Sequence, residues 1–117
     1  MNVLDIAKVV HELNKAYCEC IGDNSQPSWE DAPEWLKKGT INGVIVHLEN
    51  PDISPSATHD NWLKEKIKEG WKYGQTKNPV TKEHPCCILY EYLPTEHRAK
   101  DYIFKQAIDS LKDFLTT

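Results

Sequence analysis

Aromatic side chains and lysines gather in one stretch of the 117-residue sequence, where together they could bind a planar anion. Between Trp62 and His84 there are six Lys and three Glu, a local balance of +3 in a chain whose net charge is −4. An aromatic face beside an ammonium group suits a nucleobase and its phosphate, because stacking contributes about 1–3 kcal/mol per base and the ammonium acts as a point charge. The residues expected to contact such a ligand are His59, Trp62, Trp71, Tyr73, His84 and Tyr90, with Lys72 near the phosphate.

Each of these side chains also has a simpler structural interpretation. Trp71 follows the helix-ending Gly70, so it can cover the end of that helix as a core residue. His84 can be a hydrogen-bonded strand histidine, and His59 can either pack over Trp62 or face a pocket. The lysines can form a solvated helix face and no more. At the level of sequence both interpretations stay open.

A metal site is not expected. His84 lies close to Cys86 and Cys87, and Cys18 and Cys20 are two further soft ligands. Their spacing matches neither Cys-x-x-Cys nor His-x-x-x-His, which structural zinc sites use. We therefore expect no metal and no other cofactor.

Catalysis is not expected either, although two pairs of residues invite the idea. Cys87 with His84 could act as nucleophile and base, and Glu12 with His11 as an acid–base pair. His11 is more simply a half-buried histidine with satisfied hydrogen bonds. The chain has no glycine-rich phosphate loop, nucleophile elbow or metal-binding helix motif. The prediction is a binding protein, not an enzyme.

Composition and charge narrow the function classes further. Hydrophobic residues make up 39% and charged residues 27% of the chain, which is typical of one ordinary globular domain over residues 1–117. The net negative charge argues against binding duplex nucleic acid. No apolar run approaches the roughly 20 residues that a membrane-spanning helix needs, and no signal peptide is apparent. All four cysteines are thus expected to be reduced thiols in a cytoplasmic protein.

Two helices are predicted in the first half of the chain. The first covers residues 3–20, and Gly22 stops it. The second is capped by Ser28 or Asp31 and ends at Asn50; Val44-Ile45-Val46 has strand propensity, but the 3.6-residue period of its apolar residues favours helix. The buried face of the first helix is predicted to hold Ile6, Val9, Val10, Leu13, Ala16, Tyr17 and Cys20. That of the second is predicted to hold Trp35, Ile41, Val44, Ile45 and Leu48.

The second half is predicted to place two short extended segments between two further helices. Ser54 caps the third helix and Gly70 ends it, with Trp62, Leu63, Lys66 and Ile67 on its inner face. Residues 71–74 and 86–90 read as the extended segments, and the last helix runs from about Pro94 to Leu115. Its buried face is predicted to hold Ala99, Tyr102, Ile103, Ala107, Leu111, Phe114 and Leu115. The fold class is therefore mainly α, with four helices and a small α+β element.

Five short motifs occur in the order and spacing of a known repeat. They are His59-x-x-Trp62, Gly70-Trp71-Lys72-Tyr73-Gly74, Lys82-x-His84-Pro85-Cys86, Tyr90-x-x-Leu93-Pro94, and Asp101-Tyr102 after Lys100. In this pattern the chain resembles the repeat of ryanodine receptors. Because it is one repeat and not a tandem pair, it looks more like the stand-alone versions encoded by bacteria and their phages. The specific likeness covers residues 59–102. Calcium release is not implied, because that activity belongs to the pore of the channel.

The resemblance adds two expectations about partners. In the receptors the repeat pair is reported to hold adenine nucleotides, so the likeness implies a small-molecule binding or sensor module for a nucleotide or nucleotide-derived anion. The receptor repeats also pack in pairs, so a protein-interaction or homodimerisation module without a small ligand is the alternative.

Overall fold

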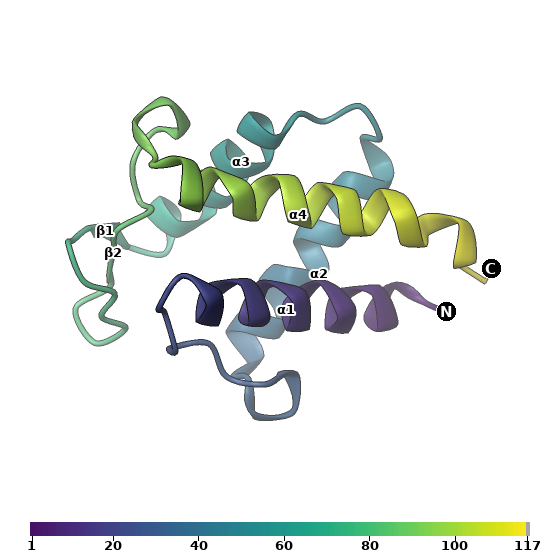
Figure 1. Ribbon diagram of the computed structural model, residues 1–117, viewed down its shortest axis with the longest axis horizontal. Coiled ribbons are helices and arrows are strands. Elements are labelled where there is room, and N and C mark those ends of the chain that lie inside the picture. The colour runs from purple at the N-terminus through teal and green to yellow at the C-terminus, as the bar shows by residue number, and fades with distance from the viewer. Residues whose placement is uncertain (117) are drawn as a thin grey trace. The chain divides into compact units, whose positions relative to one another are not determined.

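The computed structural model describes residues 1–116, and within them the protein is mainly helical (Figure 1). Four helices follow one another along the chain, and two strands of two residues each separate the third from the fourth. The helices are α1 (Val3–Cys20), α2 (Glu34–Glu49), α3 (Pro55–Lys68) and α4 (Thr95–Leu111), and the strands are β1 (Lys72–Tyr73) and β2 (Glu83–His84). Short 3-10 turns lie at η1 (Trp29–Asp31), η2 (Tyr90–Tyr92) and η3 (Lys112–Phe114). The predicted fold class is confirmed.

The chain forms two compact units. The first consists of residues 1–53 and 102–116, and the second of residues 54–101. The first is built from α1, η1, α2 and the greater part of α4, and the second from α3, the two strands, η2 and the first turns of α4. None of the helices described is long and apolar enough to cross a bilayer.

An apolar core holds the first unit together. α1 and α2 pack against each other, and the largest fully buried side chains include Ile6, Val10, Val44 and Ile108. Trp29 from η1 joins the same cluster. Burial of each such aliphatic side chain contributes roughly 1.5–3 kcal/mol. This core fixes α1, α2 and the second half of α4 as one body.

The buried face of α1 differs from the predicted one. Leu13 is 44% exposed and Ala16 and Cys20 are also exposed, whereas Ala7, His11 and Cys18 are buried. His11 was missed because the prediction counted apolar residues only. A polar side chain can be buried when it finds a partner, and the His11 Nε2 donates to the carbonyl oxygen of Pro27 at 2.7 Å. His11 is thus a satisfied, buried histidine.

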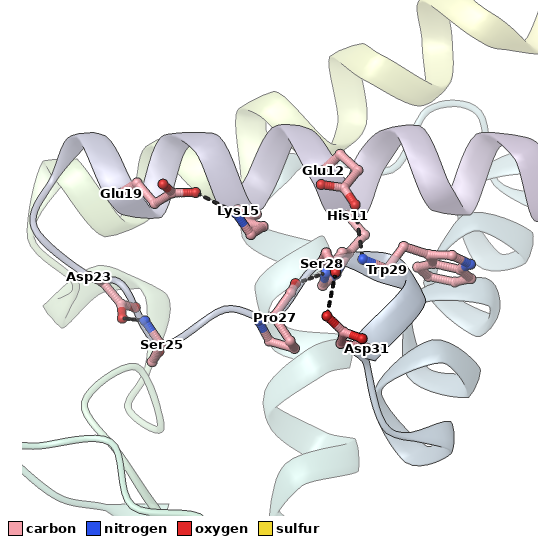
Figure 2. Close-up of polar contacts among 10 residues, drawn as sticks. All are labelled: His11, Glu12, Lys15, Glu19, Asp23, Ser25, Pro27, Ser28, Trp29 and Asp31. Carbon is pink, nitrogen blue, oxygen red and sulfur yellow. Dashed lines mark hydrogen bonds and ion pairs between the residues drawn. The ribbon is translucent and has the colours of Figure 1, made fainter.

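The loop between α1 and α2 is tied to α1 by polar contacts (Figure 2). The residue after His11 makes a second contact: the Glu12 carboxylate accepts the backbone N–H of Trp29 at 2.9 Å. Ser28 donates to the Asp31 carboxylate at 3.1 Å inside the 3-10 turn. The prediction that Ser28 or Asp31 caps the second helix was therefore wrong. That helix begins only at Glu34, after an extended Pro33.

α2 and α4 also bury fewer of the predicted residues. On α2, Val44 and His47 are buried, whereas Trp35 and Ile45 are exposed. Near the end of the chain, Tyr102 and Phe114 are 60% and 65% exposed, and Ile108 is the residue of α4 that is fully buried. Phe104 packs on the core instead, with its ring 3.0 Å from the point where a Cβ on Gly43 would stand.

The ends of α3 agree with the prediction. The Ser54 hydroxyl accepts the Ala57 N–H at 3.2 Å, and Pro55 occupies the first helical position. Gly70 has φ +91°, the left-handed conformation that glycine adopts without strain at a helix end. On the inner face Leu63 is buried, but Ile67 is 61% exposed.

The strands form a two-stranded parallel pair, in which Lys72 lies opposite Glu83 and Tyr73 opposite His84. The first extended segment was thus predicted correctly, and the second, placed at residues 86–90, was wrong. Pro85 has no N–H to donate, and the next two N–H groups turn back onto His84. That of Cys86 donates to the His84 Nδ1, and that of the following residue to the His84 carbonyl oxygen.

Candidate ligand-binding site

α3 presents three side chains of the candidate site along one face. His59, Trp62 and Lys66 are three and four residues apart, so they follow one another on the same side of the helix. Beyond the helix end, the Trp71 N–H donates to the Lys66 carbonyl oxygen at 2.9 Å. The positive φ of Gly70 makes this reversal possible. The chain therefore returns Trp71 to the face from which Trp62 projects.

Five rings from α3, β2, η2 and the segment after α3 form a chain of contacts, here called the ring cluster. Its members in order of contact are Tyr90, His59, Trp62, His84 and Trp71. Ring centroids are 5.9 Å apart for Tyr90 and His59, 5.5 Å for His59 and Trp62, 5.1 Å for Trp62 and His84, and 6.2 Å for His84 and Trp71. The contacts that His84 makes are edge-on, the arrangement that aromatic pairs prefer. The structure thus brings together five of the seven predicted site residues.

Lys66 is the cation that lies against this cluster. Its Nζ is 5.1 Å from the centre of the Trp71 ring and 6.0 Å from that of Trp62, within the range of a cation–π contact. The Glu69 carboxylate is 3.7 Å from the same Nζ. Burial lowers the pKa of Lys66, and the Glu69 charge partly offsets this. An ammonium held this way is poorly hydrated, so it would lose little bound water when it pairs with an anion.

Lys72 and Tyr73 lie elsewhere. Both belong to β1 and are exposed, Tyr73 to 51%. The backbone N–H of Lys72 donates to the carbonyl oxygen of Lys82, which holds the strand pair together. Within residues 1–116, the ring and cation contacts described for the cluster include neither side chain. The sequence could have indicated Lys66 instead, because it stands one helical turn after Trp62.

Arg98 is a second cation that sequence reasoning missed. Its guanidinium carbon is 5.1 Å from the centre of the Tyr90 ring. The same side chain donates to two backbone carbonyl oxygens, that of Tyr90 at 3.2 Å and that of Glu91 at 2.7 Å. Arg98 therefore fixes the position of Tyr90 from the first turns of α4. No motif in the sequence pointed to it, because its partners are backbone atoms of a 3-10 turn.

The five rings differ in burial. His59 and Trp71 are buried, at 3% and 8% exposure, whereas Trp62, His84 and Tyr90 are half-buried. Half-burial leaves part of Trp62, His84 and Tyr90 exposed, so these are the rings that a bound molecule can contact. The two buried rings, His59 and Trp71, pack against these half-buried rings. This burial agrees with the interpretation of Trp71 as a core residue.

His59 is held through one ring nitrogen, and its other ring nitrogen lies near a mostly buried carboxylate. Its Nε2 donates to the Ile88 carbonyl oxygen at 2.7 Å, and its Nδ1 lies 3.8 Å from the Asp101 carboxylate. Asp101 is itself mostly buried, with 14% of its side chain exposed. Burial raises the pKa of Asp101 to about 7; the Lys100 charge opposes this and the Asp60 charge adds to it.

The cysteines contribute no obvious reactive centre. Cys18, Cys20, Cys86 and Cys87 form no disulfide among the residues described. Burial raises the pKa of the Cys87 thiol, and the nearby Lys66 charge opposes this only in part. Across residues 1–116, no three His, Cys, Asp or Glu side chains converge into a group that could hold a metal ion.

The chain was compared with models of known protein families. Residues 52–117, more than half of the chain, match the family model described as "RyR domain". The matched range contains all of the ring cluster, together with Lys66, Arg98 and Asp101. It also contains the five motifs on which the resemblance to the ryanodine-receptor repeat was based.

Proposed function

Because the chain belongs to the RyR domain family, and because its ring cluster holds a half-buried ammonium, we propose that it binds a small anionic ligand without turning it over. A nucleotide or nucleotide-derived anion fits this site best. The proposal also takes a bacterial or phage origin from the resemblance, and a cytoplasmic location from the expectation that the cysteines are reduced thiols. The observation that carries it is Lys66, whose Nζ lies over the Trp62 and Trp71 rings.

In the proposed site, the rings and the ammonium group would contact different parts of the ligand. The half-buried rings of Trp62, His84 and Tyr90 would stack on or pack against a base, at about 1–3 kcal/mol for each stacked base. Lys66 would bind the phosphate, since a hydrogen bond to a charged group contributes about 1.5–3 kcal/mol. Neither interaction needs a metal ion or a nucleophile, so binding without chemistry is the simpler proposal.

A panel of mono-, di- and cyclic nucleotides in a thermal-unfolding assay tests the proposal. A ligand present at about 100 times its Kd should stabilise the protein by about 2.7 kcal/mol. Lys66→Met should abolish most of that shift, because methionine keeps the stem and removes the charge. Lys64→Met, an exposed lysine on the same helix, is the matched control and should keep it. If no nucleotide raises the unfolding temperature at millimolar concentration, the proposal is wrong.

A second candidate function rests on an apolar hollow in the first unit. It has a volume of about 380 Å³ and lies between α1 and α4, and its lining is almost wholly apolar. The apolar lining residues are Val9, Leu13, Ile103, Ala107 and Leu111. Such a surface suits self-association or docking on a larger protein. Light scattering tests it: a dimer that Leu13→Lys converts to a monomer would favour this function, and a monomer at all concentrations would count against self-association.

A further inference from the structure

Lys66, the cation proposed to bind the phosphate, already has an anionic neighbour. Its Nζ lies 3.7 Å from the Glu69 carboxylate, which makes an ion pair between residues three positions apart. The Lys66 side chain is 15% exposed and that of Glu69 is 47% exposed, so water screens the pair only in part. Together the ammonium and the carboxylate have no net charge. An anion that binds to Lys66 therefore also comes close to a negative charge.

The end of α3 adds partial negative charge at the same place. Glu69 caps the C-terminus of this helix, where the backbone carbonyl groups form the negative end of the helix dipole. Lys82 interacts with this end, because its Nζ donates to the Glu69 carbonyl oxygen at 2.7 Å. The charge of Lys82 thus balances the carbonyl groups of the helix end.

Arg98, the other cation of the ring cluster, lies over Tyr90, 5.1 Å from the centre of that ring. Its Nε donates to the Tyr90 carbonyl oxygen and its Nη2 to the Glu91 carbonyl oxygen, so two of its nitrogen atoms have backbone partners. In the series of ring contacts, His59 and Trp62 stand between Tyr90 and Lys66. Arg98 therefore positions Tyr90, and Lys66 remains the cation proposed for the phosphate.

Resting on the function proposed above, we infer that the site selects phosphodiesters over phosphate monoesters, and that Glu69 determines this preference. A phosphodiester carries one negative charge on each phosphate group, which can pair with the Lys66 ammonium. A monoester carries about two negative charges at neutral pH. The second charge would be repelled by the Glu69 carboxylate and by the end of α3. Because Glu69 is partly exposed, the result is a preference and not an absolute exclusion.

The test compares ligands that differ by one charge. 5′-AMP and its phosphate methyl ester share the base, the sugar and the 5′ linkage, but at about pH 7.5 the first carries about two negative charges and the second carries one. 5′-GMP and its methyl ester form a second pair with the other purine. The Kd of each monoester, measured by calorimetry at low salt, should be about five times that of its methyl ester, because the added charge lies near a partly screened carboxylate.

Glu69→Gln removes the repelling charge and keeps the size of the side chain. In this variant the ratio of the two Kd values should fall from about fivefold to about twofold or less. A general loss of affinity cancels from the ratio, because both ligands are measured on the same protein. Glu65→Gln is the matched control, since it removes a carboxylate that is 60% exposed and pairs with Lys68 on the same helix. It should keep the fivefold ratio.

The possible failures are distinguishable. Monoesters that bind as tightly as their methyl esters, or more tightly, would overturn the preference and leave the proposed function standing. A ratio that is unchanged in Glu69→Gln, or that falls equally in Glu65→Gln, would overturn the role of Glu69. An absence of binding by all four ligands at millimolar concentration would overturn the proposed function and this inference together.

Discussion

Lys66 and Lys72 are chemically identical side chains in the same basic stretch, and only Lys66 lies against the rings. The difference comes from the elements that carry them. Lys66 projects from α3 on the side of Trp62, whereas Lys72 belongs to a strand whose side chains are exposed. Sequence reasoning singled out Lys72 because it stands between Trp71 and Tyr73. Adjacency along a strand, however, sends neighbouring side chains to opposite faces.

A pair of substitutions separates the two lysines. Lys66→Met should weaken the binding of a nucleotide by about ten- to one-hundredfold, which corresponds to losing one charged hydrogen bond of about 1.5–3 kcal/mol. Lys72→Met should change the same Kd by less than about twofold, because an exposed charge is hydrated and screened by salt. Calorimetric titration of both variants gives the answer. A larger loss for Lys72→Met would move the phosphate position to β1 and contradict the geometry.

The ring cluster shows how much of the candidate site could be predicted from the sequence. His59, Trp62 and Lys66 share a helical face by spacing alone, and the φ of Gly70 follows from its place after the helix. Tyr90 could be predicted as a member only through its motif. Its position depends on Arg98, which reaches it by hydrogen bonds to backbone carbonyl groups. Hydrogen bonds from a side chain to backbone carbonyl groups cannot be predicted from the pattern of hydrophobic residues.

At the scale of elements, two helices begin where they were predicted to begin, and in the structure both have a side-chain cap. Asn2 and Asp5 form a capping box at the start of α1, and Ser54 caps α3. The start of α2 was missed because Ser28 and Asp31 bond each other in a 3-10 turn. The second strand was misplaced because pairing of β1 with β2 is set by distant residues, and β propensity is a weak guide there.

The two glycines of α2 make a testable contrast. Both Gly39 and Gly43 reduce helix propensity by about 1 kcal/mol relative to alanine. A Cβ on Gly39 would meet nothing within 4 Å, so Gly39→Ala should raise the free energy of unfolding by about 0.5–1 kcal/mol. A Cβ on Gly43 would lie 3.0 Å from the Phe104 ring, which packs edge-on against buried His47 at 5.0 Å. Gly43→Ala should therefore gain nothing or destabilise by about 1–3 kcal/mol.

Urea unfolding of the two variants measures this contrast, and each serves as the control for the other. Equal stabilisation by both alanines would show that the Phe104 ring moves aside without cost. In that case close packing of α4 on α2 would not be the reason for glycine at this position.

At the scale of the whole molecule, charge is unevenly distributed between the two units. Residues 54–101 carry eight Lys and Arg against seven Asp and Glu, so the net charge of this unit is +1. The remaining residues have a net charge of −5, and the two together give the −4 of the whole chain. The acidic balance of the chain thus lies outside the unit that contains the ring cluster. This distribution suits the proposed anion site, which would act by local charge within an acidic protein.

The stability of the whole molecule should respond to pH through two buried groups with opposite effects. The pKa of Asp101 is raised from 3.8 to about 7 by burial, so the folded protein keeps a proton that the unfolded chain loses. Stability from this source falls as pH rises from about 4 to about 7. Burial lowers the pKa of His47 from 6.5, so the unfolded chain takes up a proton that the folded protein refuses. Stability from that source falls as pH drops below about 6.5.

Asp101→Asn should expose the contribution of His47 alone. The free energy of unfolding of this variant should rise between about pH 5 and pH 7, whereas the unmodified protein should show a flatter or falling profile. The variant should exceed the unmodified protein most at about pH 8, by up to about 4 kcal/mol, since one pKa unit corresponds to about 1.4 kcal/mol. Urea unfolding followed by circular dichroism at several pH values measures both curves, with Asp113→Asn as the control. If Asp101→Asn follows the unmodified protein at every pH, Asp101 is not a buried acid that keeps its proton in the folded state.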